Sequence, residues 1–276
     1  MEFITNKKIP KIKKNENPTK EMSFFEHIEE LRWTILRALL YIIVLAVVIF
    51  TFKDFVFSKI IFGFLNDDFP TYKVFCALGD RFCIQAPHLS FITRQMGEQF
   101  FVHFKVSVSL ALVIAFPLII WEIWKFIAPG LNIKEQKITG RIIAVCSFLF
   151  YFGVSFGYFV IAPFAIIFFA NYSVGTVAET MPTLDSYVGF LTMLTIPAGL
   201  VFELPVVIYF LAKAGIISST FLKQYRKHAI IVIMILSAII TPPDAFTQIL
   251  IGIPVLFIYE VGIIVAKNVE KKRKDD

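Results

Sequence analysis

The chain has few charged residues and lacks the short motifs of nucleotide-dependent and zinc-dependent enzymes. Of its 276 residues only 17% are charged, where a soluble domain carries about 25%, and 57% are hydrophobic. This composition excludes an ordinary soluble domain and indicates a membrane protein. No phosphate-binding glycine loop, C-x-x-C pair or H-E-x-x-H sequence is present, and the four histidines are scattered. We therefore expect no enzyme activity, no metal and no cofactor.

Long apolar runs indicate an all-α, polytopic membrane protein. The runs are far longer than buried strands and do not alternate as barrel strands do, and a helix satisfies its own backbone hydrogen bonds in lipid. We expect six transmembrane helices, each able to cross a hydrocarbon core of about 30 Å. Their approximate positions are 33–52, 99–124, 142–169, 187–211 and two further spans between 221 and 266.

The fifth of these spans is short. Its uncharged part, Ala229–Ile240, would cover only about 18 Å as a helix. It either takes in the turn from Phe221, with flanking cations extending to the interface, or thins the bilayer locally. A re-entrant hairpin is the alternative.

The distribution of Lys and Arg predicts the orientation, because these residues are enriched on the cytoplasmic side of a membrane. The predicted outer loops hold five between Lys53 and Arg94 and none in 171–186 or 241–246. The predicted inner segments hold seven in 1–32, four in 125–141, four in 213–227 and five in 267–276. Both termini are therefore expected in the cytoplasm. The net charge of +6 is explained by these span ends, so we expect no nucleic-acid partner.

The expected domain organisation is one membrane domain, 23–267, between two polar ends. Residues 1–22 carry six lysines without periodicity and are expected to form a disordered basic tail near an anionic leaflet. Residues 268–276 are expected to form a charged cytoplasmic tail. The first apolar run begins late and is too long for a cleavable signal peptide, so none is expected.

The outer loop, 53–98, is the longest connection and is apolar enough to fold into a small cap. It contains Cys76 and Cys83 on the side where disulfides persist in a bacterial envelope. The two residues form either a disulfide or two free thiols. Cys146 lies within a span and is expected to pack in the core.

An acidic segment precedes the first span. Ser23 and Glu26 have the spacing of a capping box, which predicts a helix start. Glu26 and Glu30 lie four residues apart on one helical face, where they could meet a cation. The simpler interpretation is a solvated face with a local Glu29–Arg32 ion pair.

Glu203 is the strongest single-residue signal for function. It lies deep in the fourth span between Pro197 and Pro205, and a charged carboxylate there costs at least about 2.5–3.5 kcal/mol. It should therefore be protonated, paired, or facing water or a partner protein. Alternatively it is a neutral carboxyl bonded to a neighbouring helix. Glu122 and Glu260 lie nearer the inner boundary, where an interfacial position explains them.

The pentapeptide 153–157 reads G-x-S-x-G, the pattern of a serine nucleophile elbow. The elbow requires a strand–turn–helix context, and this segment is predicted mid-span. Its two glycines also fit a small-x-x-x-small pattern that lets helices approach closely. An intramembrane protease with Ser155 and His103 is thus a third, weaker hypothesis, after the two considered below.

Four motifs in order resemble TatC, the receptor subunit of the twin-arginine protein translocase, over most of the chain. Each motif alone is weak, but their order and spacing over 23–267 are specific. The motifs are Phe25–Arg32 (FEHIEELR), Trp124–Leu131 (WKFIAPGL) followed by Glu135, Phe202–Pro205 (FELP), and Thr241–Asp244 (TPPD) with Gln248.

This resemblance implies a glove-shaped six-helix bundle in the bacterial cytoplasmic membrane. It implies binding of twin-arginine signal peptides on folded cargo, small single-span TatA- and TatB-type partners, a homo-oligomer within the complex, and transport driven by the proton-motive force. The residues it implicates are Glu30 and Glu135 as the acids that hold the arginine pair, Arg32 and Phe126 beside them, Glu203 as the buried acid, and Asp244 and Gln248 near the partner subunits.

The outer loop departs from the shorter pattern of the family, which has no counterpart of the Cys76/Cys83 pair. The competing hypothesis from a different class is a proton-coupled small-solute transporter with Glu203 as the proton carrier. Such transporters often contain inverted repeats. No convincing match between 33–124 and 142–266 supports that alternative.

Overall fold

The computed structural model describes residues 24–79, 83–128, 139–173, 181–240 and 245–275, and this part of the chain is almost entirely helical. The one β contact in the described part is an isolated bridge between Ile92 and Thr183. The helices are α1 (Phe24–Thr51), α2 (Lys53–Phe55), the π-helical η1 (Val56–Ile61), the 3₁₀ turn η2 (Gly63–Leu65), α3 (Pro70–Ala77), α4 (Glu98–Ile127), α6 (Thr139–Phe156), the π-helical η5 (Gly157–Ile161), α7 (Ala162–Asn171), α8 (Leu184–Val201), α9 (Leu204–Lys213), α10 (Ser219–Gln224), α11 (Arg226–Ile240) and α12 (Ala245–Asp275).

Five helical segments in the described residues are long and apolar enough to cross a membrane, which confirms the all-α membrane fold. Two of them are composite: α6, η5 and α7 form one, and α8 with α9 forms another. The five segments are Phe25–Thr51, Glu98–Ile127, Gly140–Asn171, Leu184–Lys213 and Thr247–Arg273. Six spans remain a prediction with which these five are compatible.

The short fifth span is interrupted near its start. Ser218 caps α10 by accepting a hydrogen bond from the Phe221 backbone N–H at 3.0 Å, and α10 then ends at Tyr225 before α11 begins. The turn from Phe221 is thus a separate short helix and does not lengthen α11, contrary to one of the sequence interpretations. With 15 residues, α11 is about 22 Å long and packs against α12.

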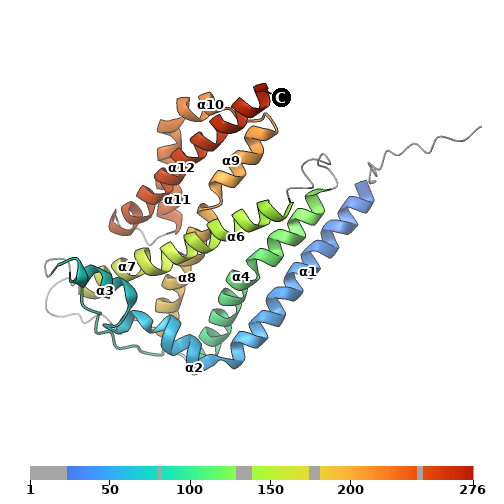
Figure 1. Ribbon diagram of the computed structural model, residues 1–276. Coiled ribbons are helices and arrows are strands. Elements are labelled where there is room, and N and C mark those ends of the chain that lie inside the picture. Colours follow the sequence, from blue (N-terminus) through green and yellow to red (C-terminus); the bar gives the residue numbers. More distant parts are fainter. Residues whose placement is uncertain (1–23, 80–82, 129–138, 174–180, 241–244, 276) are drawn as a thin grey trace, which may run out of the picture.

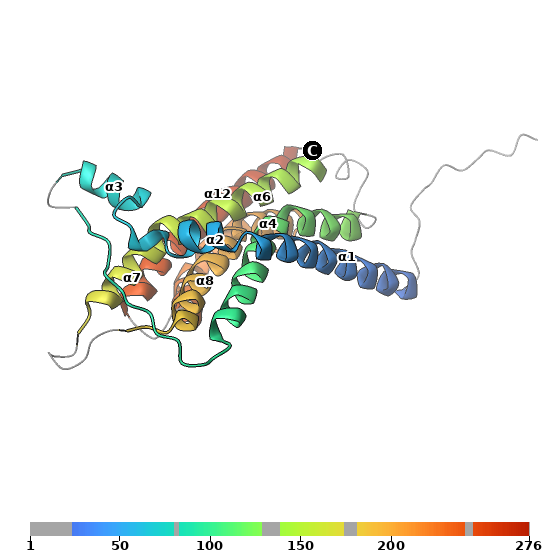
Figure 2. The same ribbon diagram turned by 90° about the horizontal axis from the view of Figure 1, so that it is seen from below.

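The helices form two groups joined by the long α6–η5–α7 segment (Figure 1). In one group α1 lies along α4, and in the other α9 and α11 pack against α12. α8 packs against α6 and η5 and so links the groups. Both views show the start of α1 far from α2 and α3, and α12 ends on the side of the bundle opposite to α3 (Figure 1, Figure 2).

Close approach of α6 to α8 explains the two glycines of the G-x-S-x-G pattern. A Cβ atom at Gly153 would lie 2.8 Å from the Ala198 carbonyl oxygen, and one at Gly157 would lie 3.0 Å from that of Leu194. The pentapeptide is helical throughout and has no strand–turn–helix context. His103 stacks on Phe50 with the ring centroids 3.8 Å apart. The glycines therefore serve helix packing, as the alternative interpretation predicted.

The outer loop folds into a cap, defined as α2, η1, η2, α3 and residues 83–97. Its tyrosine and threonine hydroxyls bond backbone carbonyls of neighbouring segments: Thr71 donates to Phe159 at 2.5 Å, and Tyr72 donates to Phe64 at 2.9 Å. Burial raises the pKa of Tyr72 to about 12, so its hydroxyl stays protonated as this donor requires. The cap is thus attached to the bundle through hydrogen bonds and through the packed rings of Phe64 in η2, Phe69 just before α3 and Tyr158 in η5.

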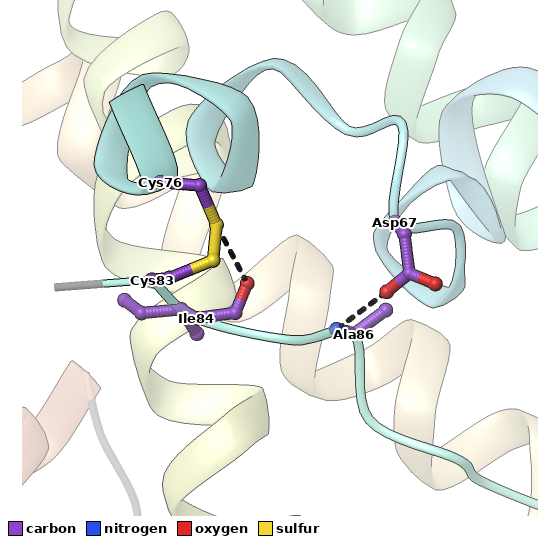
Figure 3. Close-up of a disulfide and its surroundings, with 5 residues drawn as sticks. All are labelled: Asp67, Cys76, Cys83, Ile84 and Ala86. Carbon is purple, nitrogen blue, oxygen red and sulfur yellow. Dashed lines mark hydrogen bonds between the residues drawn. A yellow bond between two sulfur atoms is a disulfide. The ribbon is translucent and has the colours of Figure 1, made fainter. Parts of the chain in front are cut away.

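A disulfide joins Cys76 at the end of α3 to Cys83 (Figure 3). Three residues further on, the Ala86 backbone N–H donates to Asp67 at 3.0 Å. Together these links hold the start and the end of the segment from Asp67 to Ala86 close together, which gives the cap a fixed shape. Cys146 is a buried free thiol in α6, as expected.

The end of α12 is part of the folded structure. Residues 268–275, expected to form a charged tail, continue the helix to Asp275. Glu270 accepts hydrogen bonds from the Ser219 backbone N–H at 2.7 Å and from the Ser219 hydroxyl at 2.5 Å. These bonds attach the last turns of α12 to the start of α10.

Candidate functional site

A group of charged and polar side chains lies between α1 and the end of α4, and we call it the charged cluster. On α1 its members are spaced four, three and four residues apart, so they form one stripe along the helix. On α4 they are three residues apart and close to the helix end. The members are Glu30, Thr34, Arg37 and Tyr41 of α1 and Glu122 and Lys125 of α4.

Arg37 lies at the centre of the charged cluster and contacts both acids. Its Nη2 atom is 3.1 Å from Glu30 Oε1 and 3.3 Å from the Thr34 hydroxyl oxygen. Its Nε atom donates to Glu122 Oε2 at 2.7 Å. A single guanidinium therefore bridges the two helices, and the Glu30 carboxylate already binds a guanidinium in this structure.

Glu122 is the buried member, with only 1% of its surface exposed. Its other oxygen, Oε1, accepts from Lys125 at 3.1 Å and from the Tyr41 hydroxyl at 3.3 Å. A buried carboxylate is tolerated only when it is paired and hydrogen-bonded, and here two cations and a hydroxyl meet that requirement.

Sequence reasoning missed Glu122 and Arg37 as members of a site. It treated Glu122 as an ordinary interfacial acid, because its main partner lies 85 residues earlier in the chain. The sequence did contain one indication of this site. Arg37 lies inside the first apolar run, and no acid lies three or four residues from it on the same helix. Such a residue requires a partner from another helix.

The residues next to Glu30 in the predicted site differ in their environment. Phe126 is half-buried and stacks on His27, with ring centroids 4.3 Å apart and an interplanar angle of 19°. This contact adds to the α1–α4 pairing. Arg32 is exposed, and among the described residues no ion pair joins it to Glu29. The local pair considered for this segment is therefore absent, and Glu30 instead pairs with Arg37.

Two predicted site residues, Glu135 and Asp244, lie outside the described residues. Gln248, the neighbour predicted with Asp244, is in the first turn of α12. Its Nε2 atom donates to the Met234 carbonyl oxygen at 3.0 Å, which links α12 to α11. Arg226, the first residue of α11, and Glu260, in the middle of α12, form an ion pair at 2.6 Å, which accounts for Glu260.

Glu203 occupies the break between α8 and α9. The residue precedes the first turn of α9, whose second residue is Pro205, and its carboxyl group lies beside the Cys146 thiol of α6. Its Oε1 atom is buried and has no hydrogen-bond partner among the described residues. The acid is thus half-buried at an irregular point of the fourth span, as the two prolines predicted.

The described residues contain no group of three or more His, Cys, Asp or Glu side chains that could hold a metal ion. The charged cluster instead holds two acids and two cations, which are paired with one another. Glu30 and Glu122 bind guanidinium and ammonium groups, and only Glu30 is accessible to a ligand, because 43% of its side chain is exposed.

Comparisons with known proteins agree on one family. A model of the family described as Sec-independent protein translocase protein (TatC) matches residues 26–254. The TatC protein of Blattabacterium sp. subsp. Periplaneta americana (strain BPLAN) is 35% identical over 264 residues, covering 93% of this chain and 99% of that protein. TatCy of Bacillus subtilis (strain 168) is 31% identical over 252 residues, covering 91% of this chain and 91% of that protein.

A solved structure has the same fold. The crystal structure of a twin-arginine translocase receptor, TatC, is 28% identical in sequence and matches with a TM-score of 0.71. The match covers 88% of this chain and 99% of that one. The chain belongs to the TatC family and is a multi-pass membrane component of Sec-independent protein translocation.

Proposed function

We propose that the chain is the receptor that binds twin-arginine signal peptides of folded proteins and nucleates the translocation complex. In this proposal it lies in the bacterial cytoplasmic membrane with both termini in the cytoplasm, and the charged cluster faces newly made cargo. The observation that carries the proposal is the guanidinium already bound to the half-exposed carboxylate of Glu30.

Glu30 has capacity for a second guanidinium. Arg37 contacts only its Oε1 atom, and among the described residues no hydrogen bond reaches Oε2. A carboxylate can accept about four hydrogen bonds, so an incoming arginine can bind while Arg37 remains. Because Arg37 is also bonded to the buried Glu122, it stays in place and holds the Glu30 side chain toward α4.

A carboxylate receptor explains a preference for arginine over lysine in the ligand. The guanidinium is planar, always charged, and donates two parallel hydrogen bonds to one carboxylate, whereas the ammonium group of lysine acts as a point charge. Two adjacent arginines require two acids. We assign the second to Glu135, and the resemblance of 124–131 and Glu135 to a TatC motif supports this assignment.

The neighbours of Glu30 suit the flanks of a bound peptide. The stacked rings of His27 and Phe126 offer an apolar surface beside the acid. Arg32 is exposed two residues after Glu30 and would repel ligands in which the arginine pair is out of register. These assignments extend the site along the start of α1.

The remaining predicted residues belong to assembly and transport in this proposal. Small single-span TatA- and TatB-type subunits and further copies of the chain complete the complex, with Asp244 and Gln248 near the docking site. The buried, unbonded oxygen of Glu203 supports a polar contact within the membrane during transport, which the proton-motive force drives. The transporter alternative is not proposed, because the family is that of a protein translocase.

Crosslinking of a signal peptide to two single variants tests the receptor assignment. Glu30→Ala should reduce crosslinking at least about tenfold, because it removes a charge-assisted hydrogen bond of about 1.5–3 kcal/mol. Glu29→Ala is the matched control: it removes the same charge from an exposed neighbour, and we expect a change of less than twofold. Membrane insertion should be normal in both. Equal crosslinking of the two variants would refute the assignment of Glu30.

A further inference from the structure

A groove between α6, α9 and α12 has the form of a lipid site. Its volume is about 510 Å³, within the range of about 300–1,000 Å³ that is typical of ligand pockets. The side chains along it are mainly aliphatic and come from all three helices. They include Ile142, Val145 and Leu149 of α6, Pro205 and Val206 of α9, and Val261 and Val265 of α12.

Two cations also line the groove. Arg141 lies in the first turn of α6 and Lys272 lies near the end of α12, so helices far apart in sequence bring both charges to one groove. No carboxylate lines the groove, and among the described residues neither cation forms an ion pair. The positive end of the α6 dipole lies beside Arg141 and adds to the attraction for an anion.

We propose that this groove binds one anionic phospholipid, with the phosphate held by Arg141 and Lys272 and an acyl chain along the aliphatic walls. Charge complementarity selects this occupant. The walls suit a hydrocarbon chain, and two unpaired cations suit a phosphate, as in basic pockets between transmembrane helices. A zwitterionic lipid would fill the same walls, but the positive charge of its headgroup would weaken its binding at the two cations.

The site differs from the charged cluster in its ligand and in its helices. The charged cluster is on α1 and α4 and contains the accessible acid Glu30, whereas the groove involves α6, α9 and α12 and, among the described residues, is lined by cations without any acid. A lipid in the groove would hold α6, which joins the two helix groups, against α9 and α12 of the second group (Figure 1). It would thus stabilise the arrangement of the two helix groups.

Lipid retention by the purified protein tests the proposal. The full chain in mild detergent is equilibrated with phosphatidylglycerol or phosphatidylcholine, and bound lipid is counted by native mass spectrometry. Wild type should retain phosphatidylglycerol in preference to phosphatidylcholine. The double variant Arg141→Gln/Lys272→Gln should bind phosphatidylglycerol about 30-fold more weakly, equivalent to about 2 kcal/mol for two cations. Inorganic phosphate should not compete, because the acyl chain contributes to binding.

Two controls separate the groove from general charge effects. Lys223→Gln/Lys227→Gln removes the same charge from exposed positions on α10 and α11 that do not line the groove, and it should change retention less than twofold. Val145→Trp should fill the groove and reduce retention with both cations present, since Val145 is exposed there and the change should not unfold the chain.

Three results would overturn the proposal: equal retention in the two double variants, equal retention of the two lipids by wild type, or unchanged retention in Val145→Trp. The last of these would show that the lipid binds elsewhere and leave the groove for another occupant, such as the helix of a partner subunit.

Discussion

Removal of Arg37 is the most informative perturbation of the charged cluster, because its guanidinium is the link between the exposed acid and the buried one. Arg37→Gln deletes the donors to Glu30 and Glu122 while keeping a long polar side chain. Glu122, which is 1% exposed, is then left with Lys125 at 3.1 Å and Tyr41 at 3.3 Å as its partners.

The expected cost follows from the environment of the two partners. Breaking a buried ion pair on one side costs about 3–5 kcal/mol, because it leaves an uncompensated buried charge. Here Lys125 remains and Arg37 is 37% exposed, so we expect a smaller loss of about 2–3 kcal/mol. Removing both charges with Arg37→Gln/Glu122→Gln should bring the free energy of unfolding back to within about 1 kcal/mol of the wild-type value.

Denaturant unfolding in detergent measures both changes, with the midpoint as the readout. The account predicts a large shift for Arg37→Gln, a small one for the double variant, and a coupling free energy of at least about 1 kcal/mol between the two sites. Equal midpoints for the single and the double variant would refute the reasoning that Arg37 neutralises a buried acid.

Three further predictions concern other parts of the chain. Gly153→Ala should destabilise the fold by about 1–3 kcal/mol because its Cβ would meet the α8 backbone, whereas Gly140→Ala, with nothing within 4 Å, should be neutral; thermal unfolding compares them, and equal melting temperatures would contradict the close approach. Replacing Cys76 and Cys83 by serine should favour opening of the cap by about 2–3 kcal/mol and accelerate its cleavage by an added protease, and an unchanged cleavage rate would mean that the disulfide does not restrain the cap. Glu203→Gln should retain more transport than Glu203→Leu if the residue acts as a hydrogen-bonding polar group, and wild-type transport in both would show that the acid is merely tolerated.

The membrane architecture was predictable because it depends on long apolar runs and on the positions of prolines and glycines. The five spans in the described residues lie where hydropathy predicted them. Their observed ends differ from the predicted ends by up to about nine residues, because polar turns extend helices such as α1 beyond the apolar core. The paired glycines Gly153 and Gly157 were correctly given a packing role as one alternative. The break at Tyr225 was missed, because it is a local departure of the Tyr225 backbone from helical geometry (φ −93°, ψ 14°) that apolar periodicity does not reveal.

The charged cluster was only partly predictable, because its central bond crosses between two helices. Glu30 was identified from its helical face and from the family resemblance, but the bridge from Arg37 to Glu122 joins residues 85 apart. Sequence spacing shows ion pairs within one helix and not between helices. The same limitation applies to Arg141 and Lys272, which were only counted as span-end charges before the fold brought them to one groove.

The most direct test of the central claim is a thermodynamic cycle between Glu30 and the arginine pair of the ligand. Affinities of the purified protein are measured for a signal peptide with Arg-Arg and for the same peptide with Lys-Lys, on wild type and on Glu30→Gln. The account predicts that wild type prefers Arg-Arg by about tenfold or more and that Glu30→Gln loses most of this preference, because the bidentate acceptor is gone. An undiminished preference in Glu30→Gln would contradict the assignment of this carboxylate as the arginine receptor.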